Sequence, residues 1–320
     1  QLVIATHGDE ASFGTITATE EFFFAWKDIF PEQYRDYTPP LGKERQQEVL
    51  IQGLLAPAIL LDVIRNCTIF MVAGKQLVKV VCRYQQYRAM LKIIERMRKG
   101  TTSHERSGVI WHTQGSGKSL TMVFAIRKIR SCEDLKNYKI CMINDRIDLE
   151  DQLGETATLT GEKVTFINSS EELKSKLATK SSNLNMVMVH KFKENQQELP
   201  EYLAGALGEK ERVPEYTPME VVNNSDRIVC MIDEAHRSQG GDIGDNLFSA
   251  FPNATLLAFT GTPLITDRHA KKTWQRFGGY IDKYRLQDAV DDGATVQILY
   301  EGKTADTALN EKHEFDTKFE

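Results

Sequence analysis

The fold is decided by the stretch Gly108-Val109-Ile110-Trp111-His112-Thr113-Gln114-Gly115-Ser116-Gly117-Lys118-Ser119-Leu120-Thr121-Met122. Its apolar start predicts a buried strand, and the run from 118 to 130 predicts a helix. Glycines in the turn between them let backbone N–H groups point inward, beside the positive end of the helix dipole. The stretch therefore predicts a phosphate-binding loop, in which Lys118 reaches the β- and γ-phosphates of ATP and the Ser119 hydroxyl ligates Mg²⁺.

One position departs from the general pattern of such loops. The pattern G-x-x-x-x-G-K-[ST] has glycine where this chain has His112. Taken alone, the stretch is also compatible with a glycine-rich turn that binds no nucleotide. The choice between the two depends on the rest of the chain.

The composition is that of an ordinary globular protein. The chain has 320 residues, of which 41% are hydrophobic and 27% charged, which gives room for about two domains. No run approaches the roughly 18 apolar residues of a membrane span, and the first residues lack the basic segment of a secretory signal. The five cysteines are scattered and form no C-x-x-C pair, which predicts a reduced, cytoplasmic protein without disulfides or a zinc site.

The net charge of −5 gives no argument for a nucleic-acid partner, so any such argument must be local. One basic patch exists between Lys75 and Lys99, where eight basic residues accompany a single acid, Glu95. Two interpretations stay open for this patch: a solvated helix face, or a surface that contacts phosphates.

Beyond the loop, apolar strands alternate with helices. The predicted strands are 109–111, 138–143, 164–167, 186–189, 228–232 and 255–259, and the predicted helices are 83–98, 118–130, 146–153, 171–178 and 244–250. A helix interrupted by Pro57 is expected over 44–66, and a surface excursion over 194–226. Short apolar strands alternating with helices predict an α/β fold, with a parallel sheet covered by helices on both faces.

A second signal follows the strand 228–232. Five apolar residues deliver Asp233 and Glu234 to the carboxyl end of a buried strand, where open α/β sheets bind ligands. In a phosphate-loop NTPase the first acid holds Mg²⁺, and the second acts as a general base toward water. An ordinary acidic helix cap would also explain the pair. Because the loop upstream is an independent signal, the two together favour an ATP·Mg²⁺ site.

A third signal is the run Leu256-Leu257-Ala258-Phe259-Thr260-Gly261-Thr262-Pro263. An apolar strand again ends in small hydroxyl residues around a glycine. Thr260 and Thr262 are candidates for hydrogen bonds to the acidic pair that sense the γ-phosphate, with Gly261 between them. A simple turn is the alternative.

These three runs resemble motifs I, II and III of superfamily 2 helicases and translocases in their DEAH-box form: His112 to Ser119, Asp233 to His236, and Thr260 to Pro263. More narrowly, the chain resembles the restriction (R, motor) subunit of type I restriction–modification enzymes over about residues 75–303. The spelling Trp-His-Thr-Gln-Gly-Ser-Gly-Lys-Ser is typical of that family, so the resemblance also accounts for His112. It implies a RecA-like motor lobe.

The resemblance adds expected roles for further residues. The nucleotide cradle comprises Thr113, Gly115, Ser116, Gly117, Lys118 and Ser119. Gln85, at the start of the helix 83–98, is similar to the family's adenine-reading glutamine, because an amide carries both a donor and an acceptor. The adjacent Gln86 is its rival, and an ordinary polar helix position is the alternative for Gln85.

The same resemblance implies a DNA-facing side and a coupling residue. Asp145, Arg146 and His190 would lie on the DNA face, with Arg146 contacting a phosphate, although an arginine at a helix start is often only solvated. His236 would couple hydrolysis to movement. The implied partners are double-stranded DNA and the modification and specificity subunits, with no membrane.

The expected domain organisation also rests on the resemblance. Residues 1–43 would end an N-terminal nuclease domain, 44–74 form a helical linker, 75–303 form motor domain 1, and 304–320 lead toward a second lobe. No cluster of acids with a lysine stands out in residues 1–70, which implies that the nuclease residues lie upstream of residue 1. About 20 residues follow Tyr300, too few for the second lobe, which in such motors supplies arginine fingers.

Some residues are better explained without a functional role. Glu172-Leu173-Lys174 spells a nuclease-like E-x-K string, but it follows Ser169-Ser170 and is expected to belong to a helix cap. Trp111 and the aromatic run 22–26 are expected to pack in the core rather than stack on bases.

Two alternatives to the restriction motor remain at this point. One is another superfamily 2 enzyme, such as an RNA helicase or a chromatin-remodeller-like translocase. The other is a non-catalytic nucleotide-binding scaffold, against which the intact Lys118, Asp233 and Glu234 argue.

Overall fold

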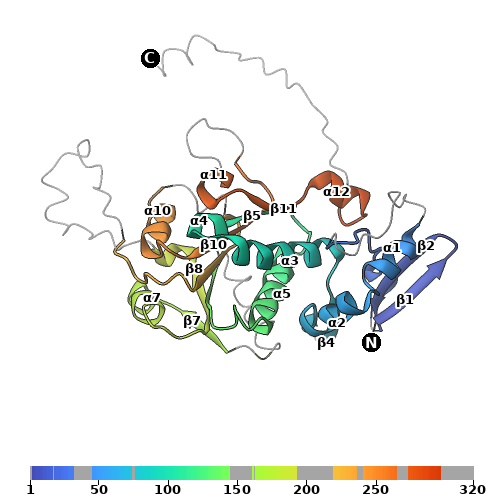
Figure 1. Cartoon of the computed structure of the whole chain (residues 1–320), viewed down its shortest axis with the longest axis horizontal. Coiled ribbons are helices and arrows are strands. Elements are labelled where there is room, and N and C mark those ends of the chain that lie inside the picture. The colour runs from blue at the N-terminus through green and yellow to red at the C-terminus, as the bar shows by residue number, and fades with distance from the viewer. Residues whose placement is uncertain are drawn as a thin grey trace, which may run out of the picture.

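A parallel sheet of seven strands forms the centre of the computed structural model, in the order β11-β5-β10-β9-β6-β8-β7 (Figure 1). The structure describes residues 2–16, 18–31, 45–73, 76–144, 161, 163–192, 219–235, 241–264 and 273–296. The strands are β5 (Gly108–His112), β6 (Lys139–Asn144), β7 (Val164–Ile167), β8 (Leu184–Met188), β9 (Ile228–Ile232), β10 (Thr255–Thr260) and β11 (Tyr280–Tyr284). The predicted strands are thus confirmed to within two residues at each end.

Side chains that alternate along each strand divide the core into two layers. One layer packs beneath α3 (Tyr84–Lys99) and α5 (Lys118–Ser131), with strand residues such as Ile110, Met142 and Met231. The opposite layer packs against α7 (Ser170–Leu177), α10 (Gly241–Ala250) and α11 (Thr273–Phe277). Apolar side chains therefore point to both faces of the sheet, which explains why the strands read as continuous apolar runs. The predicted RecA-like α/β fold is confirmed.

The three motif-bearing strands lie side by side. β10 pairs with β5 through Thr260 and Trp111, and with β9 through Ala258 and Ile232. Because these strands are parallel, their carboxyl ends meet at one edge of the sheet. Three signals that are far apart in the sequence therefore converge at that edge.

The N-terminal residues form smaller elements beside the large sheet, in blue in Figure 1. They are the antiparallel pair β1 (Leu2–His7) and β2 (Glu10–Thr15), the 3-10 turn η1 (Glu20–Phe22), α1 (Gln46–Gln52), α2 (Pro57–Asn66), and the antiparallel pair β3 (Thr68–Ala73) and β4 (Gln76–Val81). Trp26 joins them to the motor part: it is fully buried between Phe13 and Tyr87, with ring centroids 5.6 and 5.8 Å away. Core packing is confirmed for Trp26, whereas Phe22 is exposed.

Some local features differ from the expectations. The β3–β4 hairpin crosses the expected boundary at residue 74, because apolar residues on both sides of that position pair with one another. The helical region expected over 44–66 is interrupted, as predicted, between α1 and α2; Pro57 is the first residue of α2, where no N–H is needed. The predicted helix 146–153 lies outside the described residues, as does most of the excursion 194–226.

The cap predicted near Ser169 is confirmed. The Ser169 hydroxyl accepts a hydrogen bond from the Glu172 N–H at 3.1 Å, and the Glu172 carboxylate accepts one from the Asn168 N–H at 2.9 Å. The hydrogen bond from the Asn168 N–H, together with one from the Lys176 side chain, lowers the pKa of Glu172. The E-x-K string is thus a helix start.

Among the described residues, no single helix is long and apolar enough to cross a membrane; α1 and α2 together, bent by 76°, meet that criterion by length and composition only. All five cysteines are free.

Candidate nucleotide-binding site

The phosphate loop runs from the end of β5 into α5. Gly115 and Gly117 have φ of 79° and 80°, a left-handed conformation that side-chain-bearing residues adopt only with strain. The Ser116 hydroxyl closes the turn by donating to the Thr113 carbonyl at 2.6 Å. Gly117 is the N-cap of α5, and Lys118 is its first residue. The loop thus curls around a helix N-terminus, where an anion is favoured by the free N–H groups and by the helix dipole.

The acidic pair lies opposite the loop lysine. Lys118 is buried and its Nζ is 3.9 Å from Oε1 of Glu234, which follows the end of β9. Glu234 has φ of 44°, the one positive φ among the described non-glycine residues. Such backbone strain concentrates at functional sites, where the surrounding structure holds it in place. Asp233 is also buried, and its N–H donates to the Ile143 carbonyl of β6 at 2.9 Å.

The third motif touches the loop directly. A Cβ at Gly261 would lie 3.1 Å from the Gln114 nitrogen, so glycine permits this close approach. The Trp111 indole N–H donates to the Gly261 carbonyl at 3.1 Å. Thr260 is fully buried, and its hydroxyl accepts from the Thr262 N–H at 3.2 Å, which forms the turn. The loop and the third motif therefore share one contact surface.

The first turn of α3 lies against the loop through Gln86. Its side-chain nitrogen donates to the Gly117 carbonyl at 3.0 Å, and its oxygen accepts from the Arg83 N–H at 2.8 Å. Gln85 is just as buried, but neither of its amide atoms has a hydrogen-bond partner. Of the two glutamines, Gln86 is therefore the one that contacts the phosphate loop, and the role of Gln85 as the adenine reader stays a prediction.

His112 has a structural partner that the sequence pattern did not reveal. Its ring is fully buried, and Nε2 lies 2.9 Å from the Asp282 carboxylate on β11. Burial lowers the pKa of His112, with Asp282 opposing the shift in part. Burial alone would raise the pKa of Asp282, but hydrogen bonds from His112 and Arg88 outweigh it and hold that pKa well below its usual range. At neutral pH Asp282 is therefore an acceptor, and His112 Nε2 carries the proton.

Asn144 is a further buried polar residue at the same sheet edge. Asn144 is the last residue of β6, whose Ile143 pairs with Ile232 at the end of β9. Asp233 directly follows that neighbouring strand. Asn144 is fully buried, and neither side-chain polar atom has a hydrogen-bond partner. Polar atoms in this position are rare in a finished core, which makes Asn144 a candidate member of the site that its lack of charge concealed in the sequence.

Several predicted residues cannot be placed. His236, Asp145 and Arg146 lie outside the described residues. His190 lies in the 3-10 turn η3 (Val189–Phe192) after β8, where it is exposed. The structure therefore assembles the ATP side of the prediction and leaves most of the DNA side open.

The basic patch of α3 is mostly engaged in contacts within the chain. Arg88 and Lys92 bind Asp282, Arg98 binds Asp134, and Lys99 binds Glu95. Arg96 donates to the carbonyl oxygens of Ser107 and Gly278. These contacts favour a structural role for the patch over phosphate contacts.

The comparison with protein families agrees with this geometry. The family model described as SWI2/SNF2 ATPase matches residues 85–320, from α3 through all three motifs. The chain belongs to the SWI2/SNF2 ATPase family.

Among individual proteins, the chain is similar to endonuclease subunits of type I restriction enzymes. The chain is 31% identical over 322 aligned residues to the type I restriction enzyme HindI endonuclease subunit of Haemophilus influenzae, covering 94% of this chain and 28% of the relative. It is 27% identical to the putative type I restriction enzyme MjaIXP endonuclease subunit of Methanocaldococcus jannaschii, covering 99% and 30%. The chain thus spans less than a third of the length of these relatives.

Among the solved structures that match the chain is a nuclease-deletion mutant of the type ISP restriction-modification enzyme LlaGI in complex with a DNA substrate mimic, with a TM-score of 0.41 and 14% identity over 67% of this chain and 20% of that one.

Proposed function

We propose that this SWI2/SNF2 ATPase chain is the ATP-binding lobe of the motor in a type I restriction endonuclease subunit. In the whole subunit, ATP hydrolysis would drive translocation along double-stranded DNA that ends in cleavage. The observation that carries the proposal is the approach of Lys118 to the strained Glu234, 3.9 Å apart, beside the glycine loop. Lys118 and Glu234 belong to two separate motifs. In the proposed site the Lys118 ammonium would meet the γ-phosphate, and the Glu234 carboxylate would meet the attacking water.

Each residue of the site has a distinct proposed role. Lys118 binds phosphate oxygens as a point charge, and the loop N–H groups from Gly115 onward donate to the same phosphates. Glu234 orients a water molecule and takes its proton as general base. A bound Mg²⁺ would supply positive charge that offsets the charge of the phosphates.

The donor set suits Mg²⁺ held jointly by protein and phosphate. Within the described part of the chain, no group of three His, Cys, Asp or Glu side chains is arranged to hold a metal ion by itself. Ser119, in the first turn of α5, and Asp233, after β9, offer the hard oxygen atoms that Mg²⁺ prefers, which suits an ion that would keep water and share its ligands with ATP. We propose these two residues as its protein ligands.

Thr260, Gly261 and Thr262 would couple the site to movement. Gly261 packs against the loop backbone, so a change in the loop on hydrolysis is transmitted to the turn after β10. His236 is proposed to act with them. Arg146, Asp145 and His190 are proposed for the DNA face, since they follow β6 and β8 in the sequence.

The wider assembly is likewise a proposal based on the resemblance and the named relatives. Residues 1–43 would belong to the nuclease part, 44–74 to a linker that includes β3, 75–303 to motor domain 1, and 304–320 to a connector toward a second lobe with arginine fingers. The partners would be duplex DNA and the modification and specificity subunits, in the cytoplasm.

Stimulation by nucleic acid tests the proposal. In a subunit with both lobes, duplex DNA should stimulate ATP hydrolysis and single-stranded RNA should not. Stimulation by RNA alone would instead support an RNA helicase, and ATP binding without hydrolysis in any condition would support a scaffold. The isolated 320-residue chain should bind ATP·Mg²⁺ weakly with little DNA-stimulated turnover, and strong stimulated turnover by it would contradict the one-lobe account.

A further inference from the structure

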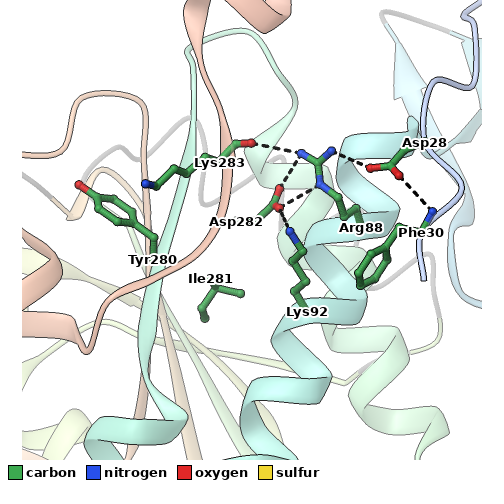
Figure 2. A pocket seen from close by; sticks show the side chains of 8 residues that line it. All are labelled: Asp28, Phe30, Arg88, Lys92, Tyr280, Ile281, Asp282 and Lys283. Atoms are coloured by element: carbon green, nitrogen blue, oxygen red, sulfur yellow. Dashed lines mark hydrogen bonds and ion pairs between the residues drawn. The ribbon is translucent and has the colours of Figure 1, made fainter. Parts of the chain in front are cut away.

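A carboxylate outside the three motifs lies at the centre of an ionic cluster next to the phosphate loop. Asp282 of β11 is 3% exposed, and three side chains converge on it, of which Figure 2 shows Arg88 and Lys92. His112 Nε2 lies 2.9 Å from it, Arg88 donates to it at 2.9 and 3.1 Å, and Lys92 donates at 2.8 Å. A buried charge with this many donors is fixed in place, since any movement would leave it unpaired.

The first partner of Asp282 is His112, which directly precedes the phosphate loop. His112 is the last residue of β5, and the following Thr113 receives the hydroxyl hydrogen bond that closes the turn. The Thr113 N–H donates to the Tyr284 carbonyl of β11 at 2.9 Å. The first residues of the loop are therefore attached to β11 by a backbone bond and by the His112 side chain.

The second partner of Asp282 is Arg88, which also binds the N-terminal segment. Arg88 lies on α3 beyond Gln86, the residue that contacts the loop at Gly117. Its guanidinium also donates to Asp28 at 2.9 Å and to the Lys283 carbonyl at 3.2 Å (Figure 2). Asp28 precedes every element of the motor, so a continuous chain of contacts runs from the N-terminal segment to the loop.

We propose that Asp282 is a positioning residue for nucleotide binding, which holds His112 and hence the phosphate loop in its binding conformation and links it through Arg88 to Asp28. The inference rests on the proposed function, because it assumes that the loop binds ATP. Asp282 does not touch the nucleotide itself. It acts by fixing the tautomer and orientation of His112 and the distance between β5 and α3.

The alternative is that the cluster only stabilises the fold. In that case its loss would lower stability without a specific effect on the ATP affinity of the folded protein. The proposal differs in one readout, the ATP affinity at a temperature where the variant is folded, and the tautomer of His112 reports whether the contact with position 282 has changed. An amide at position 282 can donate to Nε2, which permits the other tautomer, with the proton on Nδ1.

The test compares Asp282→Asn with Asp134→Asn in the full chain. Asp134 pairs with Arg98 on the same helix α3, but on the surface and away from the loop. Asp282→Asn should weaken ATP·Mg²⁺ binding about ten-fold, as expected for loss of a charge-assisted hydrogen bond. Asp134→Asn should leave binding unchanged. The ¹⁵N spectrum of His112 should shift toward the Nδ1–H tautomer in Asp282→Asn alone.

Unchanged affinity in a folded Asp282→Asn protein would overturn the proposal, as would an equal loss in both variants. If Asp282→Asn does not fold, Asp28→Asn decides instead, since Asp28 is only half-buried and asparagine keeps the shape of its side chain. It should weaken ATP binding about three-fold through Arg88, and no change would overturn the proposal. Lys118→Ala distinguishes a failure of the positioning role of Asp282 from a failure of the proposed function. If Lys118→Ala also leaves ATP binding intact, the proposed function itself fails.

Discussion

The Gln86 side chain donates a hydrogen bond to the carbonyl oxygen of Gly117 across 3.0 Å. This contact joins the first turn of α3 to the N-cap of α5, so the helix before the loop and the helix after it are held together at the phosphate site. It also leaves no room at Gly117, where a Cβ would overlap the Gln86 amide nitrogen.

Alanine substitutions at the two loop glycines should therefore differ in stability. Both glycines have positive φ, so each change to alanine should cost about 1 kcal/mol in free energy of unfolding. Gly115→Ala meets no other atom within 4 Å. Gly117→Ala should cost about 1–3 kcal/mol more because of the overlap with Gln86. Urea unfolding of the nucleotide-free chain measures the difference, and equal costs would contradict the packing described.

The two adjacent glutamines provide a matched pair for adenine recognition. Gln86→Met should weaken ATP binding roughly ten-fold without changing the preference for ATP over GTP, since its contact with the loop is lost and both ends of the Gln86 amide are already bound within the chain. Gln85→Met should reduce the preference for ATP over GTP, because the Gln85 amide still has a donor and an acceptor for the adenine edge. Competition binding with ATP and GTP tests both variants. An unchanged preference in Gln85→Met would contradict the assignment of Gln85 as the adenine reader.

If Glu234 is the general base, its substitution should lower the rate of ATP hydrolysis without weakening ATP binding. Glu234→Gln keeps the shape of the side chain but cannot accept a proton, so kcat should fall about 100-fold or more while ATP affinity changes little. The measurement is DNA-stimulated hydrolysis in a subunit with both lobes. Glu220→Gln, at an exposed position, is the control and should retain full turnover. Normal turnover in Glu234→Gln would assign the base to another residue.

The buried His112 predicts a pH dependence of stability. Burial lowers its pKa below 6.5, so the unfolded chain takes up a proton that the folded chain does not. The stability from this residue is therefore fully present above about pH 6.5 and is lost as pH falls through the lower folded pKa, at up to about 1.4 kcal/mol per pH unit. The lowered pKa of Asp282 acts in the same direction, but only below pH 3.8.

The check is urea unfolding of the wild-type chain and of His112→Asn between pH 8 and pH 5. The wild-type chain should lose more stability than the variant over this interval. Parallel stability curves for the two proteins would show that His112 is not held neutral in the folded state.

The sequence was sufficient for the parallel sheet and for the position of the three motifs at the carboxyl ends of its strands. The apolar runs before Lys118, Asp233 and Thr260 are local signals, and each gives a strand with its polar residues at the carboxyl end. Their adjacency in the order β5-β10-β9 is set by tertiary packing, and no local pattern reveals it. It is this adjacency that places Gly261 against the loop.

The sequence was insufficient for contacts between remote residues and for the choice between two neighbouring residues of the same type. His112 departs from the loop pattern because Asp282 binds it, a partner that is remote in sequence and lies on another strand. Gln85 and Gln86 differ by about 100° around the helix, and only the packed structure shows which one faces the loop. The β3–β4 hairpin was missed because its strands fall on either side of an assumed boundary.

The central claim is that the loop at Lys118 binds ATP·Mg²⁺, and calorimetric titration of the chain with ATP in the presence of Mg²⁺ tests it most directly. Wild-type chain and the surface control Lys136→Ala, which loses only an exposed pair with Glu133, should bind with the same affinity. Lys118→Ala should lose about 100-fold or more, since a buried cation that meets phosphate is removed. Equal affinity in Lys118→Ala and wild type would contradict the account.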